Sequence, residues 1–318
     1  MQKKKKIIAV GISKLLYFTL KELPTVDFEC LLDNSYADDS YEGIPVRKYD
    51  VLKQEKLENV VFYIFAVSNH SINIIQDRLS GYGVLADQIF LYSDLFKESF
   101  ENKIHKLFGS DIAQSRYKFA KTATLNSKLT VQTTICGSWL FLESLNNTKD
   151  VAGDIAEVGC FEGGNAFLAL RSGIVPENKK FFLFDSFEGF PALSEFDPIK
   201  HKQGDLKTVL DLDEIKGTFK KFPNVKIIPG FVPGTFSQID DDSKFSLVFF
   251  DCDLYQPACD TLDFFWSKLS KGGLFLLHDY FYEPGGFSGV KKAVDEFSKL
   301  KNIESFPIWE TTMVVLRK

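Results

Sequence analysis

Several apolar segments in the second half of this sequence end in polar residues. The segments 155–158, 180–185 and 245–251 each reach an acidic residue at or near their end, and the segment 274–277 runs into a His-Asp pair. In a parallel α/β sheet the carboxyl ends of the strands meet along one edge, where ligands bind. We therefore expect one crevice lined by Glu157, Asp185, Gly230, Asp251, His278 and Asp279.

A glycine-rich turn follows the first of these segments. Gly159, Gly163 and Gly164 separate the expected strand 155–158 from an apolar run at helical spacing over 165–171. Because glycine lacks a Cβ, the backbone of such a turn can approach a ligand closely. Strand, glycine loop and helix together predict the nucleotide-binding corner of a doubly wound α/β fold.

Two acidic residues fit contacts either with a ligand or with the loop itself. Asp185 lies 28 residues after Glu157, and a carboxylate at this strand end can accept hydrogen bonds from both ribose hydroxyls of a nucleoside. Alternatively, Asp185 caps the turn that follows it. Glu157 fits either a ligand-facing carboxylate or a buried acid bonded to local amides.

A second polar cluster combines the motif Asp251-Cys252-Asp253 with His278-Asp279. The pair follows Asp251 by 27 and 28 residues across one expected helical crossover, so adjacent parallel strands would bring these ends together. The carboxylates suit a hard cation such as Mg²⁺. The histidine favours Mn²⁺ or a metal-free site in which His278 acts as base. A solvated turn is the alternative for the aspartate motif.

Alternating strands and helices in both halves of the chain predict two α/β domains with parallel sheets. We expect a small Rossmann-like domain over 1–95, a helical connector over 96–150 and the larger domain over 151–318. Two last segments, near 303–309 and 312–316, are expected to form an antiparallel hairpin at the sheet edge.

The N-terminal module resembles a small Rossmann-like domain that is fused to sugar-modifying enzymes and acetyltransferases of glycan pathways. The resemblance rests on Gly11, Asp33, Asn34 and the segment 43–46. The turn at Gly11 has one glycine where a phosphate-binding loop would have three, so its backbone cannot easily approach a pyrophosphate. Both a structural or assembly role and nucleotide-sugar binding stay open for this domain.

Composition limits the classes of protein to consider. The 318 residues leave room for two modest domains, and the formal net charge of −5 argues against a general nucleic-acid binder. The longest apolar run, 60–67, is far shorter than the roughly 20 residues that span a bilayer. Five scattered cysteines fit reduced thiols. We expect a cytoplasmic protein with no nucleic-acid or membrane partner, and a homo-oligomer remains open.

Residues 120–318 resemble the macrocin O-methyltransferase (TylF-like) family, a branch of the class I S-adenosylmethionine-dependent methyltransferases. The resemblance rests on the order and spacing of the motifs EVGCFEGG at 157–164, DSFEGFP at 185–191, DCDLY at 251–255, HDY at 278–280 and GVKKAVDEF at 289–297. It implies a Rossmann-like seven-stranded sheet with a reversed last strand.

The resemblance also implies a role for each motif. The glycine loop would hold the methionine part of S-adenosylmethionine, Asp185 would hold the ribose, and Ser186 and Phe187 would flank the adenosine. The cofactor contacts expected on this basis are Glu157, Gly159, Phe161, Glu162, Gly163, Asp185, Ser186, Phe187 and Gly230.

One position departs from the family pattern. Characterised relatives hold Mg²⁺ with an aspartate that matches Asp251 and with a later Asp-Asp pair, whereas His278 replaces the first aspartate of that pair here. This departure makes His278 a candidate general base. Asp251, His278 and Asp279 are thus the candidate catalytic residues and also the candidate ligands of Mg²⁺ or Mn²⁺.

The expected function is transfer of a methyl group from S-adenosylmethionine to a hydroxyl of a nucleotide-linked or glycan sugar. The insertion after Pro191 and the loop 282–288 are placed to cover this acceptor. A metal-dependent glycosyltransferase that uses the aspartate motif is one alternative, and a methyltransferase with a non-sugar acceptor is another. A nicotinamide dehydrogenase is a weaker alternative, because neither glycine loop has the GxGxxG spacing.

Overall fold

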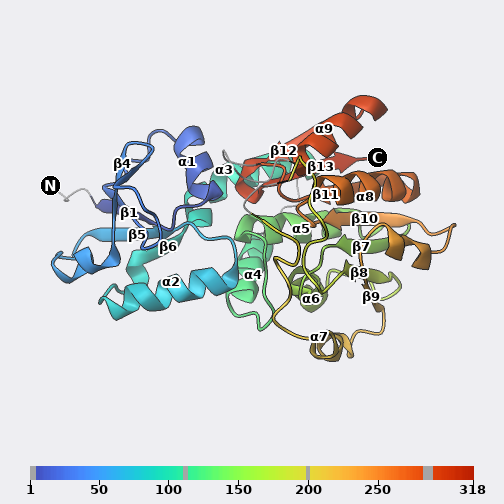
Figure 1. The fold of residues 1–318 in the computed structure, drawn as a ribbon, viewed down its shortest axis with the longest axis horizontal. Coiled ribbons are helices and arrows are strands. Elements are labelled where there is room, and N and C mark those ends of the chain that lie inside the picture. Colours follow the sequence, from blue (N-terminus) through green and yellow to red (C-terminus); the bar gives the residue numbers. More distant parts are fainter. Residues whose placement is uncertain (1–4, 110–113, 198–200, 282–288) are drawn as a thin grey trace. The chain divides into compact units, whose positions relative to one another are not determined.

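The computed structural model of the chain describes residues 5–109, 114–197, 201–281 and 289–318. Two compact units divide the chain, residues 1–101 and 102–318, and each is built on its own β-sheet (Figure 1). The expected lid over 282–288 lies outside the described residues.

The first unit contains a six-stranded sheet in the order β3-β4-β2-β1-β5-β6. Its centre is the apolar strand β1, whose residues Ala9 and Val10 are fully buried between parallel neighbours on both sides. The two-residue strand β3 is antiparallel to β4. The elements are β1 (Lys6–Val10), α1 (Lys14–Glu22), β2 (Cys30–Leu32), β3 (Ser40–Tyr41), β4 (Ile44–Arg47), β5 (Val60–Ile64), α2 (Asn69–Gly81) and β6 (Ile89–Leu91), with short 3-10 helices between them.

The second unit contains a seven-stranded sheet in the order β12-β13-β11-β10-β7-β8-β9. The five strands from β11 to β9 are parallel, and β13 runs antiparallel to both of its neighbours. This confirms the expected Rossmann-like sheet with a reversed last strand. The strands are β7 (Asp154–Val158), β8 (Phe181–Asp185), β9 (Val225–Pro229), β10 (Phe245–Phe250), β11 (Leu269–Leu277), β12 (Ser305–Ile308) and β13 (Met313–Arg317).

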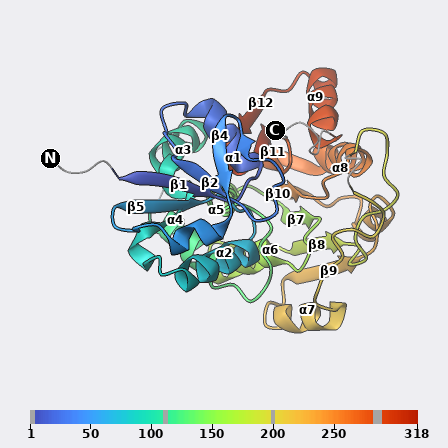
Figure 2. The ribbon, with the colours of Figure 1, turned by 60° about the vertical axis from the view of Figure 1, so that its left-hand side comes forward.

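Helices cover both faces of this second sheet because its central strands are apolar on both faces. All six residues of β10 are buried. Val248 and Phe250 join a core cluster with α8 and α9, whereas Phe249 packs against Phe141 of α5, with ring centres 5.2 Å apart. Figure 2 shows α8 and α9 side by side next to β10 and β11. The helices of the second unit are α4 (Gln114–Leu125), α5 (Ile135–Thr148), α6 (Gly164–Ser172), α7 (Leu212–Phe219), α8 (Tyr255–Lys268) and α9 (Gly289–Lys301), and α3 (Tyr92–Phe108) contains the residue boundary between the two units.

Two element boundaries differ from the sequence-based expectation. The sequence favours a helix over 259–269, whereas α8 begins at Tyr255, because Pro257 falls in the first turn, where a missing amide proton does no harm. The sequence favours a turn over 271–273 ahead of a strand at 274–277, whereas β11 begins at Leu269, and its pairing with β10 changes register between Phe245 and Leu247. No helix in the described ranges is long and apolar enough to cross a lipid bilayer.

The topology of the second sheet positions the candidate site. The carboxyl ends of β7 to β11 lie along one edge, and the antiparallel β13 brings its first residue to that same edge. Residues that follow the strands β7 to β11 can therefore contact residues that precede β13.

Candidate functional site

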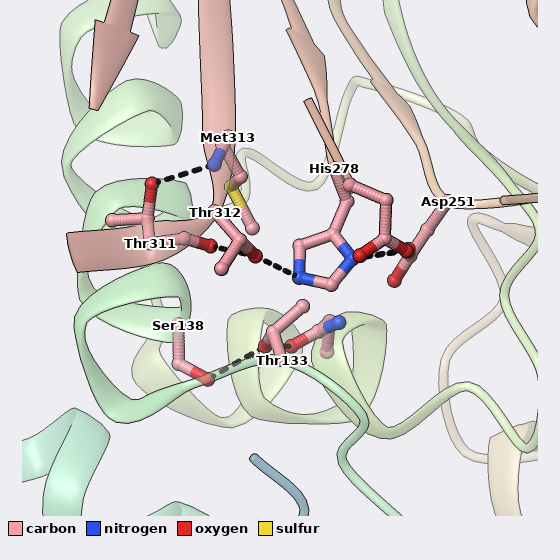
Figure 3. Close-up of polar contacts among 9 residues, drawn as sticks. Thr133, Ser138, Asp251, His278, Thr311, Thr312 and Met313 are labelled. Carbon is pink, nitrogen blue, oxygen red and sulfur yellow. Dashed lines mark hydrogen bonds and ion pairs between the residues drawn. The ribbon is translucent and has the colours of Figure 1, made fainter. Parts of the chain in front are cut away.

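Asp251, His278 and Asp279 meet at the carboxyl ends of β10 and β11. Nδ1 of His278 lies 2.7 Å from Oδ1 of Asp251 and 3.2 Å from Oδ2 of Asp279 (Figure 3). The strands are parallel neighbours in which Phe250 pairs with Leu277, so the residues that follow them are adjacent. The structure thus brings together the three residues that the sequence suggested as one cluster.

The other nitrogen of the His278 ring is bonded as well. Nε2 lies 2.7 Å from Oγ1 of Thr312, whose hydroxyl is also 2.6 Å from the carbonyl oxygen of Thr311 (Figure 3). A carbonyl can only accept, so the single hydroxyl proton goes to Thr311 and Nε2 donates to Thr312. Thr312 had not been singled out, because nothing in its sequence context marks it as a partner of His278.

The neighbouring carboxylates determine whether Nδ1 of His278 carries a proton. Two carboxylate oxygens face this atom, so it must carry a proton or meet a cation. Burial alone lowers the pKa of His278, but the nearby charges of Asp251 and Asp279 outweigh burial and raise it to about 9. The ring is therefore an imidazolium at neutral pH, bonded at both nitrogens.

The same three residues form a donor set for a divalent metal. One ligand atom from each lies within 4.8 Å of the other two, and no other such group is found in the described part of the chain. Two carboxylates and one imidazole fit Mn²⁺ better than Mg²⁺. A metal at this position would have to replace the proton on Nδ1 of His278, because that atom would be its ligand.

Asp185 accepts two backbone hydrogen bonds at the end of β8. Oδ2 accepts from the amide of Phe161 and Oδ1 from the amide of Phe187, each at 2.7 Å. The bond from Phe187 is the turn cap considered as the alternative for this residue, and the bond from Phe161 ties Asp185 to the glycine loop. Burial raises the pKa of Asp185 to about 6, although these amides act to lower it.

A cavity of about 590 Å³ opens at the ends of β8 and β9, and Ser186, which follows Asp185 in the chain, belongs to its lining. Ser186, Phe187 and Gly230, three expected cofactor contacts, line it together. The opposite wall is the segment 207–212, which precedes α7. This wall was not foreseen, because it belongs to a polar insertion without periodic pattern.

Glu157 is a buried acid bonded to neighbouring groups, one of the two roles that its sequence position allowed. One carboxylate oxygen is bonded to the side chain of Asn165 and the amide of Ala166, and Asn165 in turn accepts from Thr133 at 2.8 Å. The other, Oε2, is buried without a hydrogen-bond partner in the described part of the chain. Burial first, and then the charge of Asp251, raise the pKa of Glu157 well above its usual value.

The glycines of the loop make room for protein rather than for a ligand on their Cβ side. A Cβ on Gly159 would lie 2.3 Å from the carbonyl oxygen of Asp251, and one on Gly164 would lie 2.2 Å from that of Thr130. A Cβ on Gly163 would meet the ring of Phe219 at 2.7 Å. The glycines are therefore required for packing, and cofactor contacts of this loop would have to be made by its other side.

Glu162 lies in this loop but bonds to protein amides. Its carboxylate is 2% exposed and accepts from the amides of Thr130 at 2.9 Å and of Val209 and Leu210 at 3.3 Å each. The sequence suggested a contact with the cofactor, and the structure places the carboxylate between two protein segments.

In the first unit, the loop at Gly11 is closed by a carboxylate of the protein itself. Asp33 accepts from the amide of Ile12 at 3.0 Å and from Ser35 and Tyr36. A phosphate-binding loop would offer such an amide to the ligand. Burial acts to raise the pKa of Asp33, but these hydrogen bonds outweigh it and lower the pKa.

Comparison with known families places the second unit. The family model of the macrocin-O-methyltransferases (TylF) matches residues 142–317, more than half of the chain. The chain belongs to this family. The TylF match covers every strand of the second sheet and the whole His278 cluster.

Individual TylF-like relatives are more distant. Demethyldecarbamoylnovobiocin O-methyltransferase from Streptomyces niveus is 28% identical over 162 residues, which are 47% of this chain and 59% of that protein. The 8-demethyl-8-(2,3-dimethoxy-alpha-L-rhamnosyl)-tetracenomycin-C 4'-O-methyltransferase from Streptomyces olivaceus is 24% identical over 142 residues, 41% of this chain and 54% of that protein. The chain thus spans less than two thirds of either relative.

Among solved structures, the calicheamicin methyltransferase CalS11 superimposes with a TM-score of 0.50 at 19% identity, covering 70% of this chain and 91% of its own. This likeness supports the fold assignment of the second unit.

Proposed function

We propose that this protein is an S-adenosylmethionine-dependent O-methyltransferase that acts on a sugar hydroxyl. The proposal rests mainly on one observation: within a TylF-family chain, Asp185 is bonded to the glycine loop and directly precedes Ser186 and Phe187, which line the cavity at the ends of β8 and β9. A carboxylate at that place can bind the two ribose hydroxyls of the cofactor.

Other residues of this edge fit the remaining parts of the cofactor. The cavity lined by Ser186, Phe187 and Gly230 suits the adenine base, because it is a concave site that offers both apolar and polar side chains. Oε2 of Glu157 is a buried acceptor without a partner, and the ammonium group of the methionine part would satisfy it.

The sugar acceptor is inferred from relatives. The Streptomyces olivaceus protein is named for methyl transfer to the 4'-oxygen of a rhamnosyl group. We infer that a nucleotide-linked or glycan sugar is the acceptor here as well. An acceptor without a sugar remains the second possibility.

The proposed chemistry needs alignment and removal of one proton. The methyl group of a sulfonium is already activated, so the protein must hold the acceptor oxygen in line with the S–CH₃ bond and take its proton as the new bond forms. Asp251 is the best-placed proton acceptor, because its side chain is 10% exposed and those of His278 and Asp279 are 5% and 4% exposed.

In this proposal His278 orients Asp251 rather than acting as the base itself, since both of its nitrogens are already bonded. If a divalent metal is required, Asp251, His278 and Asp279 would hold it, and such an ion lowers the pKa of a bound hydroxyl.

Calorimetric titration with S-adenosylhomocysteine tests the cofactor assignment. We expect binding to the wild-type protein and to the Asp242→Ala variant, which removes an exposed carboxylate elsewhere, and loss of binding in Asp185→Ala. Mass spectrometry after incubation with S-adenosylmethionine and a panel of nucleoside-diphosphate sugars then identifies the acceptor.

The glycosyltransferase alternative, which uses Asp251 and Asp253, would be favoured by a different result. In that case the wild-type protein does not bind S-adenosylhomocysteine but binds a nucleoside-diphosphate sugar in the presence of Mn²⁺. Methyl transfer to a non-sugar compound would keep the enzyme class and change the acceptor.

A further inference from the structure

The carboxyl group of Glu162 is buried and is satisfied by backbone amides. Glu162 is 2% exposed, and among the described residues its oxygens accept only from backbone amides. Burying a carboxylate is costly unless hydrogen bonds compensate, and three amides supply them. Such a residue holds its partners together, because each amide would lose a strong acceptor if the carboxylate were removed.

The amides come from two segments that are far from Glu162 in the sequence. Thr130 precedes α5 by a few residues and is also fixed by close packing of its carbonyl against Gly164. Val209 and Leu210 belong to the segment 206–210, between the insertion and α7. Glu162 therefore ties the glycine loop to both flanks at once.

The segment 206–210 has little else to hold it in place. Its ends are fixed, because the carbonyl oxygen of Asp205 accepts from the amide of Phe190 and Asp211 forms a reciprocal cap with Glu214. Between these ends, in the part of the chain that the structure describes, the two bonds to Glu162 are its only hydrogen bonds.

Packing adds little to the hold on this segment. The side chains of Leu206 and Val209 are 46% and 87% exposed, so they bury little apolar surface. The two hydrogen bonds to Glu162 are thus the main contacts that hold the middle of the segment 206–210 in place.

This segment forms one wall of the cavity whose other walls contain Ser186, Phe187 and Gly230. We propose that Glu162 is a positioning residue for cofactor binding, whose carboxylate fixes the segment 206–210 as the wall of this cavity. The inference rests on the proposed function, since it takes the cavity as part of the cofactor site. Glu162 itself would not touch the cofactor.

Hydrogen exchange of the intact protein tests the attachment without any ligand. In Glu162→Gln, one oxygen is replaced by an NH₂ group that cannot accept, so either the amide of Thr130 or the amides of Val209 and Leu210 lose their acceptor, and we expect the released amides to exchange at least about tenfold faster. Glu177→Gln, which neutralises an exposed carboxylate after α6, should leave their exchange unchanged.

Calorimetry and kinetics test the link to the cofactor. For Glu162→Gln we expect binding of S-adenosylhomocysteine to weaken about tenfold and KM for S-adenosylmethionine to rise by a similar factor, with kcat at saturation little changed. A purely structural role would lower the melting temperature without this split between KM and kcat.

The variant Val209→Pro tests the same attachment independently, because it deletes one amide donor on a residue whose side chain points to solvent. We expect Val209→Pro, like Glu162→Gln, to speed amide exchange in the segment 206–210 and to weaken binding of S-adenosylhomocysteine. If Glu162→Gln does not fold, Val209→Pro alone tests the inference. If the folded variants keep the hydrogen exchange and the S-adenosylhomocysteine affinity of the wild type, the positioning role of Glu162 is overturned and the proposed function is not. A wild-type protein that does not bind S-adenosylhomocysteine would overturn the proposed function instead.

Discussion

Thr312 fixes the His278 ring from the side opposite Asp251, with its Oγ1 2.7 Å from Nε2. Thr312 has φ of +60°, a region that costs a β-branched residue on the order of 1–3 kcal/mol. Its backbone is bonded on both sides, because its amide donates to the carbonyl of Trp309 and its carbonyl accepts from the amide of Tyr280. A strained residue therefore sets the orientation of the imidazole.

Replacing Thr312 by valine should slow methyl transfer without weakening cofactor binding. The variant keeps the shape of the side chain but leaves Nε2 of His278 without its acceptor, and we expect kcat to fall about tenfold or more. Thr312→Ser should restore most of the rate. Steady-state kinetics beside calorimetry with S-adenosylhomocysteine separate the two effects, and an unchanged kcat in the valine variant would show that His278 does not orient Asp251.

Acid should weaken cofactor binding through Asp185. Because the pKa of this carboxyl is about 6, it gains a proton as pH falls through that value, and a protonated group accepts ribose hydroxyls poorly. We expect affinity for S-adenosylhomocysteine to fall by up to about tenfold per pH unit below 6. Binding that stays constant between pH 7 and about 5 would contradict the ribose contact.

The raised pKa of Asp185 also predicts that acid, which weakens cofactor binding, stabilises the fold. Since the pKa of Asp185 is higher in the folded protein than its usual 3.8, the ionised group destabilises the fold above about pH 6, and this loss disappears as pH falls towards 3.8. Asp185→Asn lacks this titration, so the free energy of unfolding of the wild-type protein relative to Asp185→Asn, measured by urea denaturation, should rise as pH falls from about 6 towards 3.8.

Chelation should leave the enzyme active. The protonated Nδ1 of His278 already places a positive charge between the carboxylates of Asp251 and Asp279, so we expect EDTA to change kcat less than about threefold. His278→Asp would remove that charge and should bind Mg²⁺ in a calorimetric titration where the wild-type protein binds it weakly. Loss of activity in EDTA that Mn²⁺ restores would instead support a metal site that includes His278.

Asp33 should matter for the stability of the first unit and not for methyl transfer. Asp33→Ala leaves the amides of Ile12, Ser35 and Tyr36 without their acceptor, and we expect a loss of about 2 kcal/mol in the free energy of unfolding. Because its pKa is lowered in the fold, this contribution is present above the usual pKa and fades as pH falls below it. Unchanged stability, together with lost binding of a nucleoside-diphosphate sugar, would favour a ligand site in this unit.

The strands and the residues at their ends were predictable from the sequence for a physical reason. Strands buried on both faces, such as β10, are continuous apolar runs, and their polar end residues must gather at one edge of a parallel sheet. The cluster of Asp251, His278 and Asp279 follows from this rule. Strand β3 could not be predicted, because two residues carry no periodicity.

The contacts of Glu162 and Thr312 could not be predicted in the same way. The partners of Glu162 are 32 and 47 or more residues away, in segments without regular structure. Thr312 reaches His278 because β13 is antiparallel to β11 and because its own φ is positive, and neither property is visible in its local sequence. The glycines of the loop were read as room for a ligand, whereas long-range packing fills that side.

The reversed strand β13 also governs the order in which the protein can be completed during synthesis. Thr312 leaves the ribosome 34 residues after His278, so until then the imidazole lacks its second partner. Over the same interval β11 has no neighbour on one side and exposes a row of unpaired backbone groups. A nascent chain paused between these two residues would leave β11 as an open edge that can pair with another chain.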